Sequence, residues 1–138
     1  MTVIDNKTQD TLLEYLTLYY SALNSGDLEL LSSIMTEESY LITLDSFGFK
    51  RAFGDKNFKQ LLKDMHDDKL SLEKVENVLR EDISKESKES KIDIIRYESN
   101  GSSRITLHYN EDVHPKKLYF SNSSGKWEID YKAGRKKG

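Results

Sequence analysis

The chain has 138 residues, which is the length of one domain and too short for two independent cores. It contains no cysteine, so disulfide scaffolds, thiol nucleophiles and thiolate metal sites are excluded, and the composition fits a reducing cytoplasm. Lys and Arg number 21 against 24 Asp and Glu, for a net charge of −3. The chain as a whole therefore repels a nucleic-acid backbone.

The C-terminal end of the chain differs in charge from the rest. The last seven residues carry four cations, Lys132, Arg135, Lys136 and Lys137. We expect a single domain over residues 1–132, followed by a basic tail without fixed structure at 133–138. The first ten residues lack an apolar run, so we expect no signal peptide, and no segment is apolar enough to span a bilayer.

Apolar periodicity predicts that the chain begins with helices. Helical spacing relates Leu12, Leu13, Leu16, Tyr19, Tyr20 and Leu23. Thr8 or Asp10 is expected to cap this first helix. Gly26 suits the left-handed position that ends it, and Asp27 can cap a second helix that runs to about Met35.

The middle of the chain carries mixed signals. We expect short strands at 40–44 and 49–53, joined by turn residues 45–48. A third helix is predicted to begin at Gly54 and Asp55. Its apolar positions are Phe58, Leu61, Leu62 and Met65. Residues 70–83 fit a helical stripe and one face of a strand equally well, so both assignments stay open.

The remainder alternates with the period of strands. After a polar loop at 84–90, we expect strands at 92–98, 104–110, 117–121 and 126–132, joined by short turns as an antiparallel meander. Three helices followed by such a sheet can bury their apolar stripes only against one of its faces. The predicted class is therefore α+β, with three N-terminal helices packed on a mostly antiparallel sheet.

Four segments taken together resemble the nuclear transport factor 2-like superfamily. Residues 19–28 (YYSALNSGDL) are similar to its first helix, which ends in Gly-Asp. The acidic pair Glu37 and Glu38, the Gly54-Asp55 step, and residues 124–129 (SGKWEI) resemble its strand entry, third helix and closing hairpin. The resemblance covers nearly the whole chain. It implies a cystatin-like cone, in which three helices wrap a strongly curved sheet around an internal pocket, and a strand at 72–83.

The resemblance does not settle the activity, because this superfamily includes ketosteroid isomerases, dehydratases, SnoaL-like cyclases and members without known activity. It maps the isomerases' general base to Ile42 or Thr43, neither of which accepts a proton near neutral pH; Asp45 lies two residues too late. We therefore expect a domain that binds a small, largely apolar ligand in the cone. A SnoaL-like or ketosteroid isomerase-like lyase or isomerase, and a non-catalytic dimeric assembly module, stay open as alternatives.

The three histidines are predicted to be structural. Strand parity places His108 on the outer face of the sheet, at the surface. His66 follows a helix beside Asp67 and Asp68, and His114 lies in a loop before the only proline; both settings favour solvated turns over a metal. The chain has no phosphate loop, nucleophile elbow or zinc-helix motif, so no cofactor and no metal are predicted.

The expected pocket is mainly aromatic. Phenol hydroxyls in a small core need partners or a wet cavity, although core packing is the default for such side chains. The pocket candidates are Tyr19, Tyr20, Tyr40, Phe53, Phe58, Arg96, Tyr109 and Trp127.

The strand predicted at 91–98 has a pattern that conflicts with itself. Ile92 and Ile94 indicate that one face is buried, whereas Ile95 and Tyr97 indicate the other, and a β-bulge would reconcile the two sets. We expect Arg96 to point into the cone and to meet an acidic group of the ligand there. In the opposite register, Asp93 points inward instead.

We also expect a homodimer through the outer face of the sheet. Tyr97 and Tyr119 alternate with apolar neighbours of the opposite parity, so one or both are exposed unless a second subunit covers them. Nucleic acid and membranes are not expected as partners.

Overall fold

The computed structural model describes residues 4–86, 90–101, 103–122 and 125–134. The helices in these ranges are α1 (Asn6–Ser25), α2 (Leu28–Ser33), α3 (Glu37–Gly54), α4 (Lys56–Asp64) and α5 (Lys69–Glu86). The strands are β1 (Ile92–Ser99), β2 (Arg104–Glu111), β3 (His114–Ser121) and β4 (Glu128–Ile129), followed by a 3-10 helix, η1 (Tyr131–Gly134). The strands form one antiparallel sheet in the order β1-β2-β3-β4. The predicted α+β class and the antiparallel sheet are confirmed.

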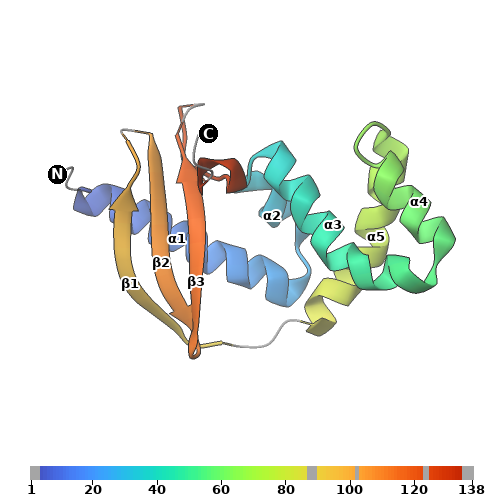
Figure 1. Cartoon of the computed structure of the whole chain (residues 1–138), viewed down its shortest axis with the longest axis horizontal. Helices are drawn as coiled ribbons and strands as arrows, with labels where there is room; N and C mark the ends of the chain where they lie inside the picture. Colours follow the sequence, from blue (N-terminus) through green and yellow to red (C-terminus); the bar gives the residue numbers. More distant parts are fainter. Residues whose placement is uncertain (1–3, 87–89, 102, 123–124, 135–138) are drawn as a thin grey trace.

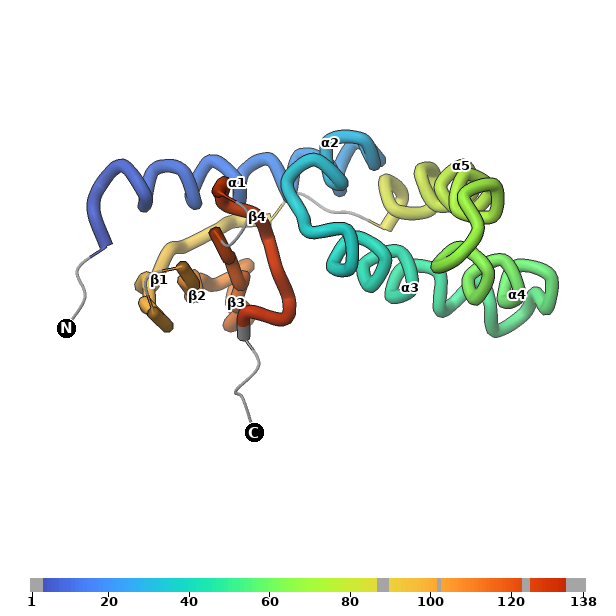
Figure 2. Tube along the Cα trace, turned by 90° about the horizontal axis from the view of Figure 1, so that it is seen from above, coloured from blue at the N-terminus to red at the C-terminus, as the bar shows by residue number. Residues whose placement is uncertain are grey.

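The helices divide between two places (Figure 1). The long helix α1 lies along one face of the sheet, and none of the described α-helices covers the opposite face (Figure 2). Helices α3, α4 and α5 pack on one another beside the sheet (Figures 1 and 2). The expected cone, with three helices wrapped on the sheet around a pocket, is not confirmed.

The start of α1 differs from its predicted cap. Asp5 is the cap, because its side chain accepts a hydrogen bond of 2.7 Å from the Thr8 backbone N–H, so the expected caps at Thr8 or Asp10 are wrong. The apolar stripe is confirmed except at Leu13, which is exposed, since Leu12 and Leu16 are buried in the core shared with the sheet. Tyr15 tilts against Phe120 of β3, with ring centroids 6.3 Å apart.

The junction between α1 and α2 confirms its prediction. Gly26 adopts φ 68° and ψ 28°, the left-handed conformation that ends α1. The Asp27 side chain accepts a hydrogen bond of 3.0 Å from the Leu30 N–H and caps α2. A Cβ atom at position 26 would lie against the Arg80 carbonyl of α5, so glycine is required here by conformation and by close approach.

Helix α3 replaces the two strands and the turn expected at 40–53, and that prediction is wrong. Thr36 caps it by accepting a hydrogen bond of 3.2 Å from the Ser39 N–H, and Glu37 and Glu38 follow in the first turn, where carboxylates favour the helix dipole. Its buried face includes Thr43 as well as apolar residues. Because small polar residues such as Thr43 are buried on α3, the apolar residues of this helix alternate with polar ones as they do in a strand.

Helices α4 and α5 occupy the segments predicted as a third helix and as a helix or strand at 70–83. Asp55 caps α4 through the Phe58 N–H at 3.1 Å, which confirms the predicted third helix. Helix α5 buries Val75, Leu79 and Ile83 at steps of four residues, so the strand implied at 72–83 is wrong. Residues 84–86, expected in a polar loop, end α5, and 87–89 lie outside the described residues.

The end of the chain joins the sheet to the helices. Met35 and Ile129 form an isolated parallel bridge, in which the Ile129 N–H donates to Ile34 and the Thr36 N–H donates to Ile129. Strand β4 covers only two residues of the strand expected at 126–132, since η1 follows. Ala133, expected in the tail, is buried in η1, and 135–138 lie outside the described residues.

Candidate functional site

Three of the predicted pocket tyrosines form one cluster where α1 meets β2. The hydroxyls of Tyr20 and Tyr109 lie 2.8 Å apart, and their rings meet edge to face with centroids 6.2 Å apart. Tyr19 packs against Tyr20 at 5.2 Å, also edge to face. Burial raises the pKa of all three phenols, so they stay protonated and do not act as bases, and in the bond between Tyr20 and Tyr109 one hydroxyl donates to the other. The cluster serves core packing.

A second set of buried hydroxyls lies nearby and occupies one position that the resemblance had mapped to a general base. Thr43 is buried on α3, where its hydroxyl lies 3.0 Å from the Tyr131 hydroxyl and donates to the Ser39 carbonyl at 2.9 Å. Ile42, the other mapped position, is on the same helix. Neither stands on a strand, so the arrangement implied by the isomerases is not formed here.

The other pocket candidates lie apart from the tyrosine cluster. The Tyr40 hydroxyl donates to Glu76 of α5 at 2.5 Å, and burial raises its pKa, with the Glu76 bond adding to the rise. Phe58 is buried beneath α3, and Trp127 is half-buried at the edge of the core. Phe53 is 83% exposed. The structure therefore does not bring these aromatic side chains together around one cavity.

Arg96 does not point inward, because β1 carries the bulge that the sequence pattern suggested. The register shifts between Ile94 and Arg96, and Arg96 lies opposite His108 on the outer face of the sheet, where it is exposed. Asp93 is exposed on that face too, opposite Asn110. Both expectations of an inward charge are wrong, since the bulge at Ile95 keeps Ile92 and Ile94 on the helix side without turning either charge inward.

The histidine on this outer face is more buried than its parity predicted. His108 is 8% exposed, because the neighbouring strands flank it, and its Nε2 lies 2.8 Å from Glu98. This contact with the imidazole lowers the pKa of Glu98. The outer face thus carries charged and polar side chains, with Tyr119 half-buried among them, whereas Tyr97 points to the helix side and contacts the Gln9 carbonyl at 3.5 Å.

An open groove between α3 and α4 combines apolar surface with positive charge. Its volume is about 860 Å³. Its apolar walls are Phe49, Ala52 and Phe53 of α3 and Leu62 of α4. Gly48 brings the two helices close, because a Cβ atom there would lie 2.9 Å from a Leu62 methyl group. The groove exists because α3 and α4 pack tightly on one side and leave two phenylalanines uncovered on the other.

The rim of the groove is basic. Lys56, Lys59 and Lys63 line it on the α4 side, and none of the ion pairs among the described residues involves them. At one end, His66 Nε2 lies 3.0 Å from an Asp45 carboxylate oxygen. Both side chains are 43% exposed, so this pair lacks the desolvated setting that acid–base catalysis favours.

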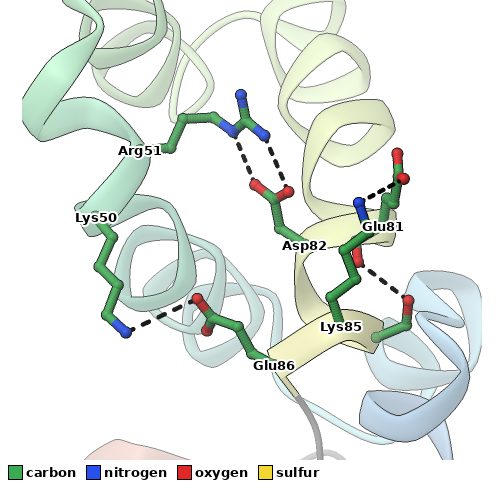
Figure 3. A network of polar contacts seen from close by, with 7 residues as sticks. Lys50, Arg51, Glu81, Asp82, Lys85 and Glu86 are labelled. Carbon is green, nitrogen blue, oxygen red and sulfur yellow. Dashed lines mark hydrogen bonds and ion pairs between the residues drawn. The ribbon is translucent and has the colours of Figure 1, made fainter.

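Ion pairs hold the groove's α3 wall against α5 (Figure 3). The Arg51 guanidinium binds both oxygens of Asp82, at 2.7 and 2.9 Å. This contact lowers the pKa of Asp82, and Lys50 lies 3.9 Å from Glu86 one turn along. The Arg51 guanidinium carbon also lies 5.9 Å from the centre of the Phe58 ring. These contacts hold the face of α3 that packs on α5, whereas the opposite face, which carries Phe49 and Phe53, stays exposed.

Sequence reasoning selected one residue of this groove, Phe53, and missed Phe49 and the lysines. A strand at 49–53 placed alternate residues in a core, which hid the fact that Phe49 and Phe53 are four residues apart on one helix face. The available signal was the helix start at Thr36, followed by acidic residues. Continued through residue 54, that helix exposes both phenylalanines.

Comparisons with known proteins identify no relative of this chain. No family model, no curated protein and no solved structure matches the chain. In the ranges that the structure describes, no three His, Asp or Glu side chains gather as metal ligands. None of the helices described here has the length and apolarity needed to cross a membrane.

Proposed function

We propose that this protein is a non-catalytic binding module, whose groove between α3 and α4 holds an acidic amphipathic helix of a partner protein. The observation that carries the proposal is the exposure of Phe49 and Phe53, at 63% and 83%, beside a rim of three lysines. Large exposed aromatic side chains mark interaction surfaces, because leaving them in water has a free-energy cost that a partner removes.

The shape and charge of the groove favour a helix as its occupant. An open groove covers only one side of what it holds, as in complexes where an amphipathic helix places residues at i, i+3, i+4 and i+7 on an apolar floor. Phe49, Phe53 and Leu62 provide such a floor. Lys59 and its neighbours on the rim would attract carboxylates that flank the apolar stripe of the partner helix. This local positive charge contrasts with the net charge of −3 for the whole chain.

A small, largely apolar molecule with an acidic group is the second candidate. The observation in its favour is the groove volume of about 860 Å³, which lies within the range of small-molecule sites. Such a molecule would use the same phenylalanines and lysines. It would lie half-open to solvent, so we rank it below a helical segment.

The test measures binding of designed probes by fluorescence anisotropy. The first probe is a labelled helical peptide with leucines at i, i+3, i+4 and i+7 and flanking glutamates, and the second carries lysines in place of the glutamates. We expect the acidic peptide alone to bind, with an affinity that falls as salt is added. Phe53→Ala should weaken binding about tenfold, or roughly 1.4 kcal/mol, and Lys59→Glu should weaken it as well.

Matched control variants distinguish binding in the groove from non-specific binding elsewhere on the surface. Val113, in the turn between β2 and β3, is also 83% exposed, so Val113→Ala removes an equally exposed apolar side chain elsewhere. Lys7→Glu repeats the charge reversal on α1. Equal binding of both peptides, or equal loss in Val113→Ala and Phe53→Ala, contradicts the proposal. Binding of anilinonaphthalene sulfonate at the groove without peptide binding supports the small-molecule candidate instead.

A further inference from the structure

Strand β1 is an edge strand with backbone groups free for pairing. Among the described strands it lies at one end of the sheet, next to β2 only. The Lys91 carbonyl accepts from Asp112 at 2.8 Å, and the Asn100 N–H donates to Arg104 at 2.9 Å, so these positions face β2. Because antiparallel residues alternate between facing the partner and facing away, the N–H and C=O groups of Ile92, Ile94 and Tyr97 point outward from the sheet. An open edge of this kind is a template for another strand.

Apolar side chains accompany this free edge. Ile94 and Ile95 of β1 are 37% and 53% exposed, and Leu13 of α1 is 40% exposed. A groove of about 680 Å³ runs between α1 and β1, with Leu13, Thr17, Ile92 and Ile94 among its lining residues. The N-terminal end of α1 reaches past β1 in both views (Figures 1 and 2). A strand added beside β1 would therefore lie beneath α1, as β1 itself does.

The sequence of this strand is complementary to itself when reversed. Residues 91–98 read KIDIIRYE. Taken from the two ends toward the middle, the pairs are Lys91 with Glu98, Ile92 with Tyr97, Asp93 with Arg96, and Ile94 with Ile95. Two antiparallel copies of the strand, related by a twofold axis between the central isoleucines, would place the three flanking pairs opposite one another, with Ile94 and the bulged Ile95 beside the axis. The Lys91–Glu98 and Asp93–Arg96 pairs would then set opposite charges against each other, and the twofold axis would form each pair twice. Apolar side chains would likewise meet apolar side chains.

The bulge is what makes this pairing possible. Residues directly opposite in an antiparallel ladder share a face of the sheet. In a regular strand Asp93 and Arg96 would lie on opposite faces, because they are three residues apart. The register shift puts them on one face, opposite Asn110 and His108, which are two residues apart on β2. The same shift places Ile92 and Tyr97, the residues that flank Asp93 and Arg96, together on the helix face of the sheet. There they lie opposite Glu111 and Leu107 of β2.

From these observations we infer that two copies of this chain pair β1 with β1, antiparallel, and join their sheets into one continuous sheet. Ile92 and Tyr97 of opposite copies exchange backbone hydrogen bonds, and Asp93 and Arg96 form ion pairs on the outer face. This interface differs from the predicted dimer through the outer face of the sheet, whose centre is charged. It is also separate from the α3–α4 groove, so each proposal stands without the other.

The experiment measures molecular mass by sedimentation equilibrium over a range of concentrations, with folding checked by circular dichroism. The wild-type chain should approach twice its 16.0 kDa. Asp93→Arg sets arginine against arginine at two symmetric places and should raise the dimer dissociation constant at least about tenfold. The double variant Asp93→Arg with Arg96→Asp restores opposite charges in the reverse order, and dimerisation should return with it.

Two further variants make the outcome decisive. Ile95→Lys changes an exposed central residue and should also give a monomer, which provides a second test where Asp93→Arg alters folding. Lys117→Glu reverses a charge opposite His108 in the middle of the outer face and should leave the dimer intact. A monomer at every concentration overturns the inference. So does a dimer that survives Asp93→Arg and Ile95→Lys, a double variant that stays monomeric, or a dimer that Lys117→Glu dissociates.

Discussion

Replacing Gly26 by alanine tests the junction that orders α1, α2 and α5. Two costs add at this position. An L-residue at φ 68° and ψ 28° is less favourable than glycine by about 1–2 kcal/mol. The new Cβ atom also meets the Arg80 carbonyl, a backbone group of α5 that cannot rotate away, and overpacking of this kind costs about 1–3 kcal/mol. We expect Gly26→Ala to lose about 2–5 kcal/mol of unfolding free energy.

Two other glycines separate these costs. Gly101 has φ 119°, and no heavy atom of the described residues lies within 4 Å of the place that a Cβ atom would take. Gly101→Ala therefore carries a conformational cost without a steric one, about 1–3 kcal/mol. Gly54, at the end of α3, has neither a positive φ nor a near neighbour in the described part of the chain. Gly54→Ala should be neutral, or stabilising by up to about 1 kcal/mol, since alanine favours a helix.

The assay is urea unfolding, followed by circular dichroism, for the wild type and the three variants. The free energies should fall in the order Gly54→Ala, Gly101→Ala, Gly26→Ala, with unchanged dependence on urea concentration. A loss in Gly26→Ala below about 2 kcal/mol, which the conformational cost alone explains, would refute the close approach of α1's end to the Arg80 carbonyl.

Three smaller perturbations address other contacts. Thr36→Ala should cost about 1 kcal/mol in urea unfolding through loss of the α3 cap, whereas Thr36→Ser should retain it; equal losses would show that the hydroxyl does not cap. Tyr20→Phe and Tyr109→Phe should each cost about 0.5–1.5 kcal/mol, with the double variant costing less than their sum in a double-mutant cycle, and strict additivity would argue against their hydrogen bond. Because Arg51 lowers the pKa of Asp82 below 3.8, the ion pair stabilises the fold above that pH, and its contribution disappears as the pH falls through the folded-state value. Asp82→Asn should therefore flatten the acid limb of stability against pH, and an unchanged limb would contradict this.

The sequence predicted elements well where caps and periodicity agreed. Gly26 with Asp27, and Asp55 with Phe58, carried a helix signal in which the cap and the apolar spacing supported the same boundary. On β2, Leu107 and its neighbours two residues away alternate strictly, and the observed strand buries them on the helix side as expected. Local rules suffice at such places because tertiary packing does not oppose them.

Prediction failed where packing inverted the usual pattern. Helix α3 buries Ser39 and Thr43 and exposes Phe49 and Phe53, so apolar residues mark its outside as strongly as its inside. The strands expected at 40–44 and 49–53 came from this local pattern, and the resemblance to a cone fold added a further strand at 72–83, where the local pattern had left a helix open. The groove was missed for the same reason, since its phenylalanines are apolar residues on the exposed face of α3.

The bridge between Met35 and Ile129 bears on the order of folding. It joins the step between α2 and α3 to the final strand, and the Tyr20 contact with Tyr109 spans 89 positions in the same way. A chain emerging from the ribosome therefore exposes the apolar face of α1 until β2 and β3 have been made, and it cannot close the bridge before β4 emerges. The α1 layer consequently completes its packing only after β2, β3 and β4 have emerged, whereas α3, α4 and α5 can associate as soon as residue 86 is free.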